Sequence, residues 1–230
     1  MAASGLFLSC EHGGNRVPAR YARHFAGTGK LLATHRGYDI GSLEAARFLR
    51  ARLDVPLISA TVTRLLVDLN RSPAHPRLFS EITRTLDTET RRQILRRHYQ
   101  PHRDKVQAMA KAGISASGRV IHLSVHSFTP EMNGHPRHCD IGLLYDPSRH
   151  LEAEFCDRWR RRLRSAEPAL IVRRNYPYRG VADGLVTYLR RRFDARRYIG
   201  VEIEINQALA KKGGPQWKRL LSVLADTLPA

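Results

Sequence analysis

The stretch Leu6-Phe-Leu-Ser-Cys-Glu-His-Gly-Gly-Asn-Arg-Val-Pro18 decides the fold. Its apolar start predicts a buried strand, which ends at Glu11 and His12, where a pair of glycines begins a turn. In open α/β folds, ligands bind at the carboxyl ends of the strands. The sequence therefore places a carboxylate and an imidazole where such a fold builds an active site.

Two later apolar runs also carry side chains suited to a catalytic centre. Residues 120–126 end in His126, and residues 198–205 contain Glu202 and Glu204. Because apolar runs alternate with helix-like segments along the chain, we expect a mostly parallel mixed sheet with helices on both faces. The predicted fold class is α/β, with one domain over residues 1–230.

The remaining elements follow from hydrophobic periodicity and from helix-breaking residues. Helical spacing predicts helices over residues 38–53, 90–112, 151–166, 184–193 and 215–227, the second of them interrupted at Pro101. Short apolar or β-branched runs predict strands over residues 55–59, 61–69, 141–145 and 170–173. Residues 74–88 are predicted to form a loop or a short helix.

Composition indicates a globular protein of the cytoplasm. Hydrophobic residues make up 42% of the 230 residues, and no apolar run approaches the roughly 20 residues that cross a bilayer. The N-terminus lacks the pattern of a secretory signal. The three cysteines are odd in number and widely spaced, which argues against a disulfide scaffold. We therefore expect a cytoplasmic location and no membrane partner.

The net charge of +18 raises the hypothesis of a nucleic-acid partner. The excess arginine falls on predicted helices, at residues 91–92, 96–97, 158–164 and 190–192, without the interleaved aromatic side chains of single-strand binders. We interpret these positions as solvated helix faces and expect no specific nucleic acid. A basic binding protein, with a structural or lost metal site, is the alternative from a different functional class.

Histidines at two strand ends favour a metal centre over two unrelated structural histidines. Zinc accepts imidazole and carboxylate ligands, and a catalytic zinc keeps one position open. His12 and His126 are the candidate imidazole ligands, and the acidic ligand is either Glu11 or Asp39. Successive side chains on a strand face opposite sides, so Glu11 can join His12 on one metal only if the strand has already turned.

Glu202 and Glu204 lie on one face of a predicted strand that is otherwise apolar. Burying an unpaired carboxylate is costly. One interpretation makes one of the pair the general base that deprotonates a metal-activated water. The other interpretation is an edge strand that exposes both carboxylates to solvent.

Polar residues after other strands are candidates for substrate binding. Arg71, assisted by Asn70, closes a predicted strand, where a guanidinium can hold a carboxylate with two parallel hydrogen bonds. The loop over residues 175–184 is rich in glycine, proline and aromatic residues, which favours a substrate wall, although its Asp183 also suits a helix cap. Its candidate substrate-binding residues are Asn175, Tyr178, Arg179 and Asp183.

Several blocks, in order from residue 6 to about residue 207, resemble the N-formylglutamate amidohydrolase family. These blocks are Cys-Glu-His-Gly-Gly-Asn-Arg-Val-Pro, Gly-Tyr-Asp-Ile-Gly, Val-Asp-Leu-Asn-Arg-Ser, Ser-Val-His-Ser-Phe, Asp-Ile-Gly-Leu-Leu-Tyr-Asp-Pro, Asn-Tyr-Pro-Tyr-Arg-Gly-Val-Ala-Asp-Gly and Gly-Val-Glu-Ile-Glu-Ile-Asn-Gln. Each block alone is weak, but together they are specific.

The resemblance implies a fold similar to the zinc carboxypeptidases and aspartoacylases, of the phosphorylase/hydrolase-like type, with Zn²⁺ as cofactor. It implies hydrolysis of the amide of a small anionic N-acyl amino acid such as N-formylglutamate, and so a role in amino-acid catabolism. Another N-acyl amino acid, a peptide or a cell-wall fragment is the alternative substrate within the same fold.

By position, the resemblance makes His12 and His126 zinc ligands and makes the Asn70-Arg71 pair a holder of the substrate carboxylate. The strand that bears Glu202 and Glu204 resembles the one that carries the catalytic glutamate, with Glu204 as the first choice and Glu202 as the second. The carboxypeptidase His-x-x-Glu motif is absent, because asparagine stands three residues after His12. The resemblance thus leaves Glu11 and Asp39 as the candidate acidic ligands.

Overall fold

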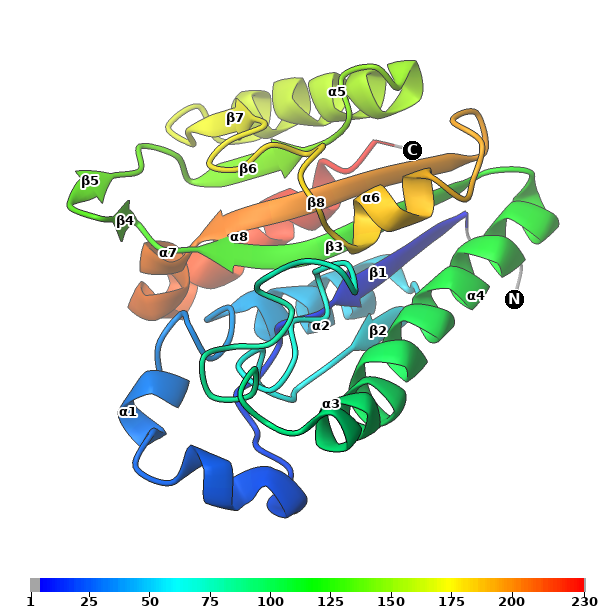
Figure 1. The fold of residues 1–230 in the computed structure, drawn as a ribbon. Helices are drawn as coiled ribbons and strands as arrows, with labels where there is room; N and C mark the ends of the chain where they lie inside the picture. The colour runs from blue at the N-terminus through cyan, green and yellow to red at the C-terminus, as the bar shows by residue number, and fades with distance from the viewer. Residues whose placement is uncertain (1–4, 230) are drawn as a thin grey trace.

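The apolar run at the N-terminus forms a strand inside a six-stranded sheet, in a computed structural model that describes residues 5–229 (Figure 1). The strand order is β2-β1-β3-β8-β6-β7. All pairs are parallel except β6 with β8, so the predicted mostly parallel mixed sheet is confirmed. The strands are β1 (Leu6–Cys10), β2 (Leu57–Ser59), β3 (Val120–Phe128), β6 (Ile141–Leu144), β7 (Val172–Arg174) and β8 (Tyr198–Asn206).

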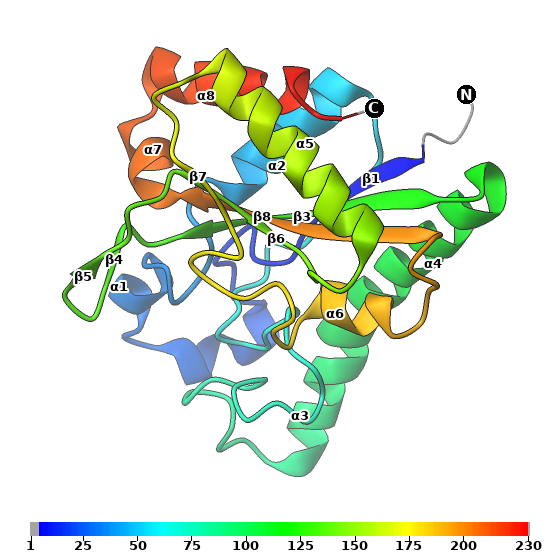
Figure 2. The same cartoon turned by 90° about the horizontal axis from the view of Figure 1, so that it is seen from above.

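Helices cover both faces of this sheet, as Figure 2 shows from above. One face packs against α2 (Ser42–Leu53), α5 (His150–Ala166) and α8 (Gly214–Asp226), whose apolar side chains form the largest hydrophobic cluster with the strands. The other face packs against α4 (Gln100–Ser117) and α6 (Leu185–Arg190). The shorter elements are η1 (Ala19–Phe25), α1 (Gly29–Leu32), α3 (Thr88–Ile94), η2 (Leu95–Tyr99), α7 (Gln207–Lys212) and the hairpin β4 (Glu131–Met132)–β5 (His135–Pro136).

The strand β8 lies between β3 and β6 and is buried along its whole length. Such a central strand is covered on both faces, which agrees with its apolar side chains Ile199, Val201, Ile203 and Ile205. The interpretation of Glu202 and Glu204 as side chains of a solvent-facing edge strand is therefore wrong. Both carboxylates are buried and need a specific reason to be there.

Several predicted segments differ from the structure, and three of the differences concern more than the exact ends of a helix or of a short strand. Residues 61–69 form turns, with only an isolated bridge from Val62 to Arg16, because Thr63 Oγ1 donates a hydrogen bond to the Gly37 carbonyl and folds the segment back. The predicted helix over residues 90–112 is split into α3, the π-helical turn η2 and α4, with Pro101 at the start of α4. Proline has no N–H for the preceding turn, so the helix changes its hydrogen-bond pattern there. Pairing with β8 extends β3 beyond His126 to Phe128.

The three cysteines are buried and free. Within residues 5–229, no helix combines the length and the apolar character that crossing a membrane requires.

The interpretation of the arginine-rich segments as solvated faces is wrong for Arg190. Its side chain is buried, and its Nε lies 3.0 Å from the Glu152 carboxylate of α5. Its Nη2 donates to the Gly200 carbonyl of β8 at 2.8 Å, and its Nη1 donates to the Gly180 carbonyl. Glu152 in turn accepts the Gly200 N–H at 3.1 Å. This buried ion pair ties α5, α6 and β8 together at the end of the sheet away from the carboxyl edge of β8.

The Arg190 interactions predict a large loss of stability on substitution. Arg190→Met should lower the free energy of unfolding by about 3–5 kcal/mol, because it leaves the buried Glu152 carboxylate without its cation. The exposed neighbour Arg191 is the matched control, and Arg191→Met should stay within about 0.5 kcal/mol of the unsubstituted protein. Urea unfolding followed by circular dichroism measures both, and equal effects of the two substitutions would contradict a structural role for the pair.

Candidate active site

Polar side chains gather at the carboxyl ends of β1 and β3, two neighbouring strands inside the sheet. Glu11 and His12 follow β1 directly, and His126 of β3 stands opposite Glu204 of β8 in the strand register. A cavity of about 490 Å³ opens there. Its lining includes His12, Asp39, Asp68, Asn70, Arg71, His126, Tyr178, Arg179, Asp183, Glu202 and Glu204.

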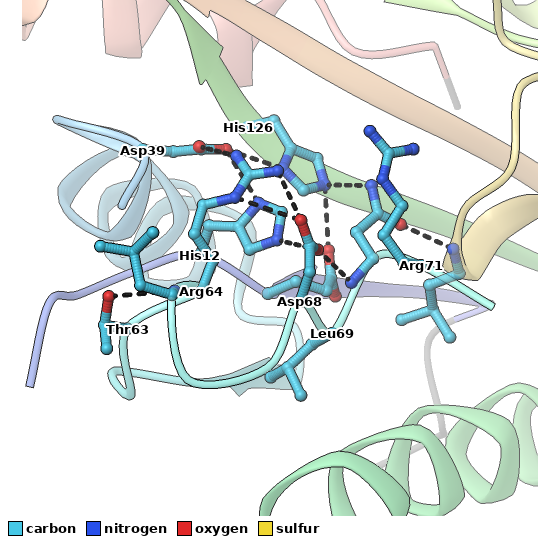
Figure 3. Close-up of polar contacts among 12 residues, drawn as sticks. His12, Asp39, Thr63, Arg64, Asp68, Leu69, Arg71 and His126 are labelled. Atoms are coloured by element: carbon cyan, nitrogen blue, oxygen red, sulfur yellow. Dashed lines mark hydrogen bonds and ion pairs between the residues drawn. The ribbon is translucent and has the colours of Figure 1, made fainter. Parts of the chain in front are cut away.

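His12, Asp39 and His126 form the centre of the site (Figure 3). The Asp39 Oδ2 atom lies 2.9 Å from His126 Nδ1 and 3.4 Å from His12 Nδ1. All three side chains are buried, and each offers one ligand atom such that these atoms lie within 4.8 Å of one another. The loop that precedes α2 therefore supplies a carboxylate that faces the Nδ1 atoms of both imidazoles.

Glu11 lies on the other side of the His126 ring. Its Oε2 is 3.0 Å from His126 Nε2 and accepts the Ser124 hydroxyl at 2.5 Å, while its Oε1 is 3.2 Å from His102 Nε2 of α4. The structure thus separates the two candidate acids, since Asp39 faces the Nδ1 side of His126 and Glu11 the Nε2 side. Burial opposes ionisation of Glu11, but its hydrogen bonds with His102 and His126 outweigh burial and hold its pKa well below the usual value.

Asp68 faces the Nε2 atom of His12, as Glu11 faces the Nε2 atom of His126. Its Oδ1 lies 2.7 Å from His12 Nε2, and its Oδ2 accepts two hydrogen bonds from Arg64. The Arg64 guanidinium also donates to Asp39 Oδ1 at 3.0 Å, which leaves Oδ2 of Asp39 to the imidazoles. A carboxylate on the second nitrogen of a histidine fixes the orientation of the ring, as is common around protein-bound metals.

Sequence reasoning missed the roles of Arg64 and Asp68. The signal for Asp68 was its place two residues before Asn70 in the Val-Asp-Leu-Asn-Arg-Ser block. Arg64 gave no such signal. The sequence predicts a strand over residues 61–69, whereas the structure has a turn there, and this turn directs both side chains to the centre.

The buried charges of the centre do not balance. Burial opposes ionisation of Asp39 and Asp68, but their histidine and arginine partners hold the pKa of both carboxylates well below the usual value. With Glu11 they supply three negative charges, against the guanidinium of Arg64 and the imidazole of His126. Burial disfavours a charged imidazole at His126, yet the carboxylates on both of its nitrogens raise its pKa well above the usual value. The centre therefore attracts additional positive charge.

Glu202 and Glu204 have different surroundings although they lie on the same face of β8. The Asn70 amide donates to Glu202 Oε2 at 3.4 Å. Among the described residues 5–229, no side chain or backbone group makes a hydrogen bond to the buried Oε2 of Glu204. Burial, with the nearby Asp39 and Glu202 charges, raises the pKa of Glu204 to about 8 despite the opposing effect of His126.

The candidate substrate-binding residues divide into two groups. Arg71 and Asp183 line the cavity and hold each other, since Arg71 Nη1 donates to the Asp183 carbonyl at 2.8 Å. Tyr178 and Arg179 also line the cavity. Asn175, in contrast, turns its side-chain oxygen to the N–H groups of Tyr145 and Gly180, both at 3.0 Å, and so holds the shape of the loop from outside the cavity lining.

Asn70 connects the substrate loop to the centre. Its side-chain oxygen accepts the Leu185 N–H at the start of α6 at 2.6 Å, while its amide nitrogen lies 3.5 Å from His126 Nε2. One asparagine thus contacts α6, β3 and β8, and it connects the loop before α6 to the strands that carry His126 and Glu202.

Two solved structures are similar to this protein over nearly the whole chain. A gene product of Agrobacterium tumefaciens has a similar structure, with a TM-score of 0.80, 29% sequence identity and alignment over 99% of this chain and 91% of the other. The N-formylglutamate amidohydrolase of Ralstonia eutropha has the same fold, with a TM-score of 0.74, 19% identity and 99% and 92% of the two chains aligned. The comparison with curated protein sequences gave no match.

The family model that describes N-formylglutamate amidohydrolases matches residues 4–210, from the strand β1 to the helix α7. That span includes every residue of the centre and of the cavity lining described above. The protein therefore belongs to the N-formylglutamate amidohydrolase family and is an amidohydrolase.

Proposed function

We propose that the protein hydrolyses the amide bond of a small anionic N-acyl amino acid, with zinc as its cofactor and N-formylglutamate as the first substrate to test. The observation that carries this proposal is the buried carboxyl group of Glu204, directly across the strand register from His126. Within residues 5–229, the Oε2 atom of Glu204 has no hydrogen-bond partner. This arrangement places a group able to accept a proton beside a cluster able to hold a metal.

The residues of the centre fit a zinc ion. Two imidazole nitrogens and one carboxylate oxygen form a donor set of the kind found in catalytic zinc sites. The uncompensated negative charge of Glu11, Asp39 and Asp68 matches a divalent cation. His12, Asp39 and His126 would be the ligands, with Asp68 and Glu11 each holding the second nitrogen of one imidazole.

A zinc ion bound there would polarise the scissile carbonyl and lower the pKa of water. Glu204 accepts the proton of the attacking water as the water oxygen bonds to the carbonyl carbon. The same carboxyl group then gives the proton to the amine nitrogen as the carbon–nitrogen bond breaks. Burial suits Glu204 to both steps, because it brings the pKa of the group to about 8 and so near neutrality.

The cationic side chains of the cavity suit the carboxylate of the amino acid. Arg71 is positioned by its hydrogen bond to the Asp183 carbonyl, and a guanidinium can bind a carboxylate through two parallel N–H groups. Tyr178 and Arg179 also line this cavity. The acids of the cavity disfavour a nucleic-acid backbone, so we expect no specific nucleic-acid partner.

The ligand assignment predicts different metal binding for two acid substitutions. Asp39→Asn should lose stoichiometric zinc, because it removes the anionic oxygen that faces the Nδ1 atoms of both imidazoles. Glu11→Gln should keep zinc with about 10–100-fold weaker affinity, because only the support of His126 is lost. Elemental analysis after dialysis and competition with a chelator measure both.

The exposed Asp54→Asn serves as the matched control for these metal measurements and should bind zinc like the unsubstituted protein. Circular dichroism checks the fold of each variant. Full zinc content in Asp39→Asn together with zinc loss in Glu11→Gln would reverse the assignment of the acidic ligand.

The base assignment predicts a catalytic defect without a metal-binding defect. Glu204→Gln should lower kcat for formate release from N-formylglutamate by about 10²–10⁴-fold and leave zinc content unchanged. Glu202→Gln is the matched comparison and should have the smaller effect, because Glu202 already accepts a hydrogen bond from Asn70. Zinc loss in Glu204→Gln would make that residue a ligand instead of the base.

The unsubstituted protein supplies the controls for the substrate. A chelator should abolish formate release, and added zinc should restore it. If zinc is bound but no formate appears, a panel of other N-acyl amino acids tests the reaction class separately from the acyl group.

A further inference from the structure

A second cavity, of about 540 Å³, lies outside the active site at the β2 edge of the sheet. The segment from β2 to residue 62 forms one side of it, and the turn η2 with the start of α4 forms the other. Figure 1 shows β2 beside this helical segment. The cavity shares no lining residue with the active-site cavity.

Positive charge dominates this second cavity. Arg16, Arg97 and Lys105 line it, together with His98 and His102, and no acidic residue belongs to its lining. None of these three cationic side chains makes an ion pair within residues 5–229. Burial and the charges of Arg16 and Arg97 lower the pKa of His98, as expected where positive charge is uncompensated. The active-site cavity differs, since acids accompany its arginines.

The floor of the second cavity is apolar. Leu57, Ile58 and Val62 line it and remain partly exposed, and the buried Val67 and Leu69 line it as well. A cavity with an apolar floor and a cationic rim matches a ligand that has an apolar body and an anionic end. Neither the apolar nor the cationic side chains of this cavity line the active-site cavity.

The inner wall of the cavity is His102. Its imidazole is buried, and its Nε2 lies 3.2 Å from the Glu11 carboxylate, which supports His126 on its other side. The second cavity is therefore close to the metal-ligating residues but separated from them by a hydrogen-bonded side chain.

We propose that this cavity is a binding site for a small amphiphilic anion, with Arg97 and Lys105 of the helical side and Arg16 of the opposite loop around the anionic group. The anionic group is a phosphate or a carboxylate, since both accept hydrogen bonds from guanidinium and ammonium groups. The apolar body lies on Leu57, Ile58 and Val62.

Isothermal titration with phenyl phosphate, benzoate and inorganic phosphate tests the site. Phenyl phosphate or benzoate should bind at least about 10-fold more tightly than inorganic phosphate, because only the aromatic ligands use the apolar floor. The tighter of the two aromatic ligands identifies the anionic group. Equal affinities for phenyl phosphate and inorganic phosphate, with no binding of benzoate, would overturn the amphiphilic site.

Paired charge substitutions locate the binding. Arg97→Gln with Lys105→Gln should weaken binding of the preferred ligand by about 10-fold or more. Arg92→Gln with Lys111→Gln removes the same charge from exposed positions of α3 and α4 outside the cavity lining and should change the affinity by less than about twofold. Equal weakening in both double variants would mean general electrostatic attraction and would overturn the proposal.

A substitution in the active site completes the test. Arg71→Ala should leave the binding of the preferred ligand unchanged, because Arg71 lines only the active-site cavity. Loss of binding in this variant would assign the ligand to the active site and would also overturn the proposal. Thermal unfolding of each variant confirms that the folded state is retained.

Discussion

The His126 imidazole, buried between the carboxylates of Asp39 and Glu11, is the constraint on which the rest of the site depends. Buried carboxylates are costly unless each has partners. The partners come from distant parts of the chain: Ser124 from β3, His102 from α4, and Arg64 from the turn after β2. The fold therefore has to hold β1, β3, α4 and this turn in register for the centre to exist.

Much of this arrangement could be predicted from the sequence because it follows from strand ends. Apolar runs mark β1, β3 and β8, and parallel strands bring their carboxyl ends to one edge. His12, His126 and Glu204 lie at or near those ends and meet in space. Local patterns are sufficient for such residues, since their position depends only on where a strand runs.

The residues that the sequence did not predict act through turns and tertiary contacts. Residues 61–69 have the composition of a strand, but the Thr63 hydrogen bond to Gly37 folds them so that Arg64 and Asp68 reach the centre. Asn175 is predicted as a substrate-binding residue, but its side-chain oxygen accepts hydrogen bonds from the backbone N–H groups of Tyr145 and Gly180. In each case the deciding partner lies far away in the sequence or is a backbone group, and periodicity contains no information about either.

The distribution of charge explains how a chain with a net charge of +18 fits a small-molecule reaction. Some of the arginine is structural: Arg190 is buried against Glu152, and Arg64 neutralises part of the carboxylate cluster.

Within the active-site cavity, acids stand among the arginines. This pattern agrees with the proposed substrate, whose carboxylate would bind at Arg71 while its amide would lie near Glu204. A nucleic-acid backbone would bring several phosphates close to Asp68, Asp183 and Glu202 at once, and each such contact is repulsive. A single small anion avoids that repulsion, since it presents one end to Arg71 and its uncharged amide to the acidic centre. We therefore propose that the local pattern of opposite charges, more than the net charge of the chain, selects the class of ligand.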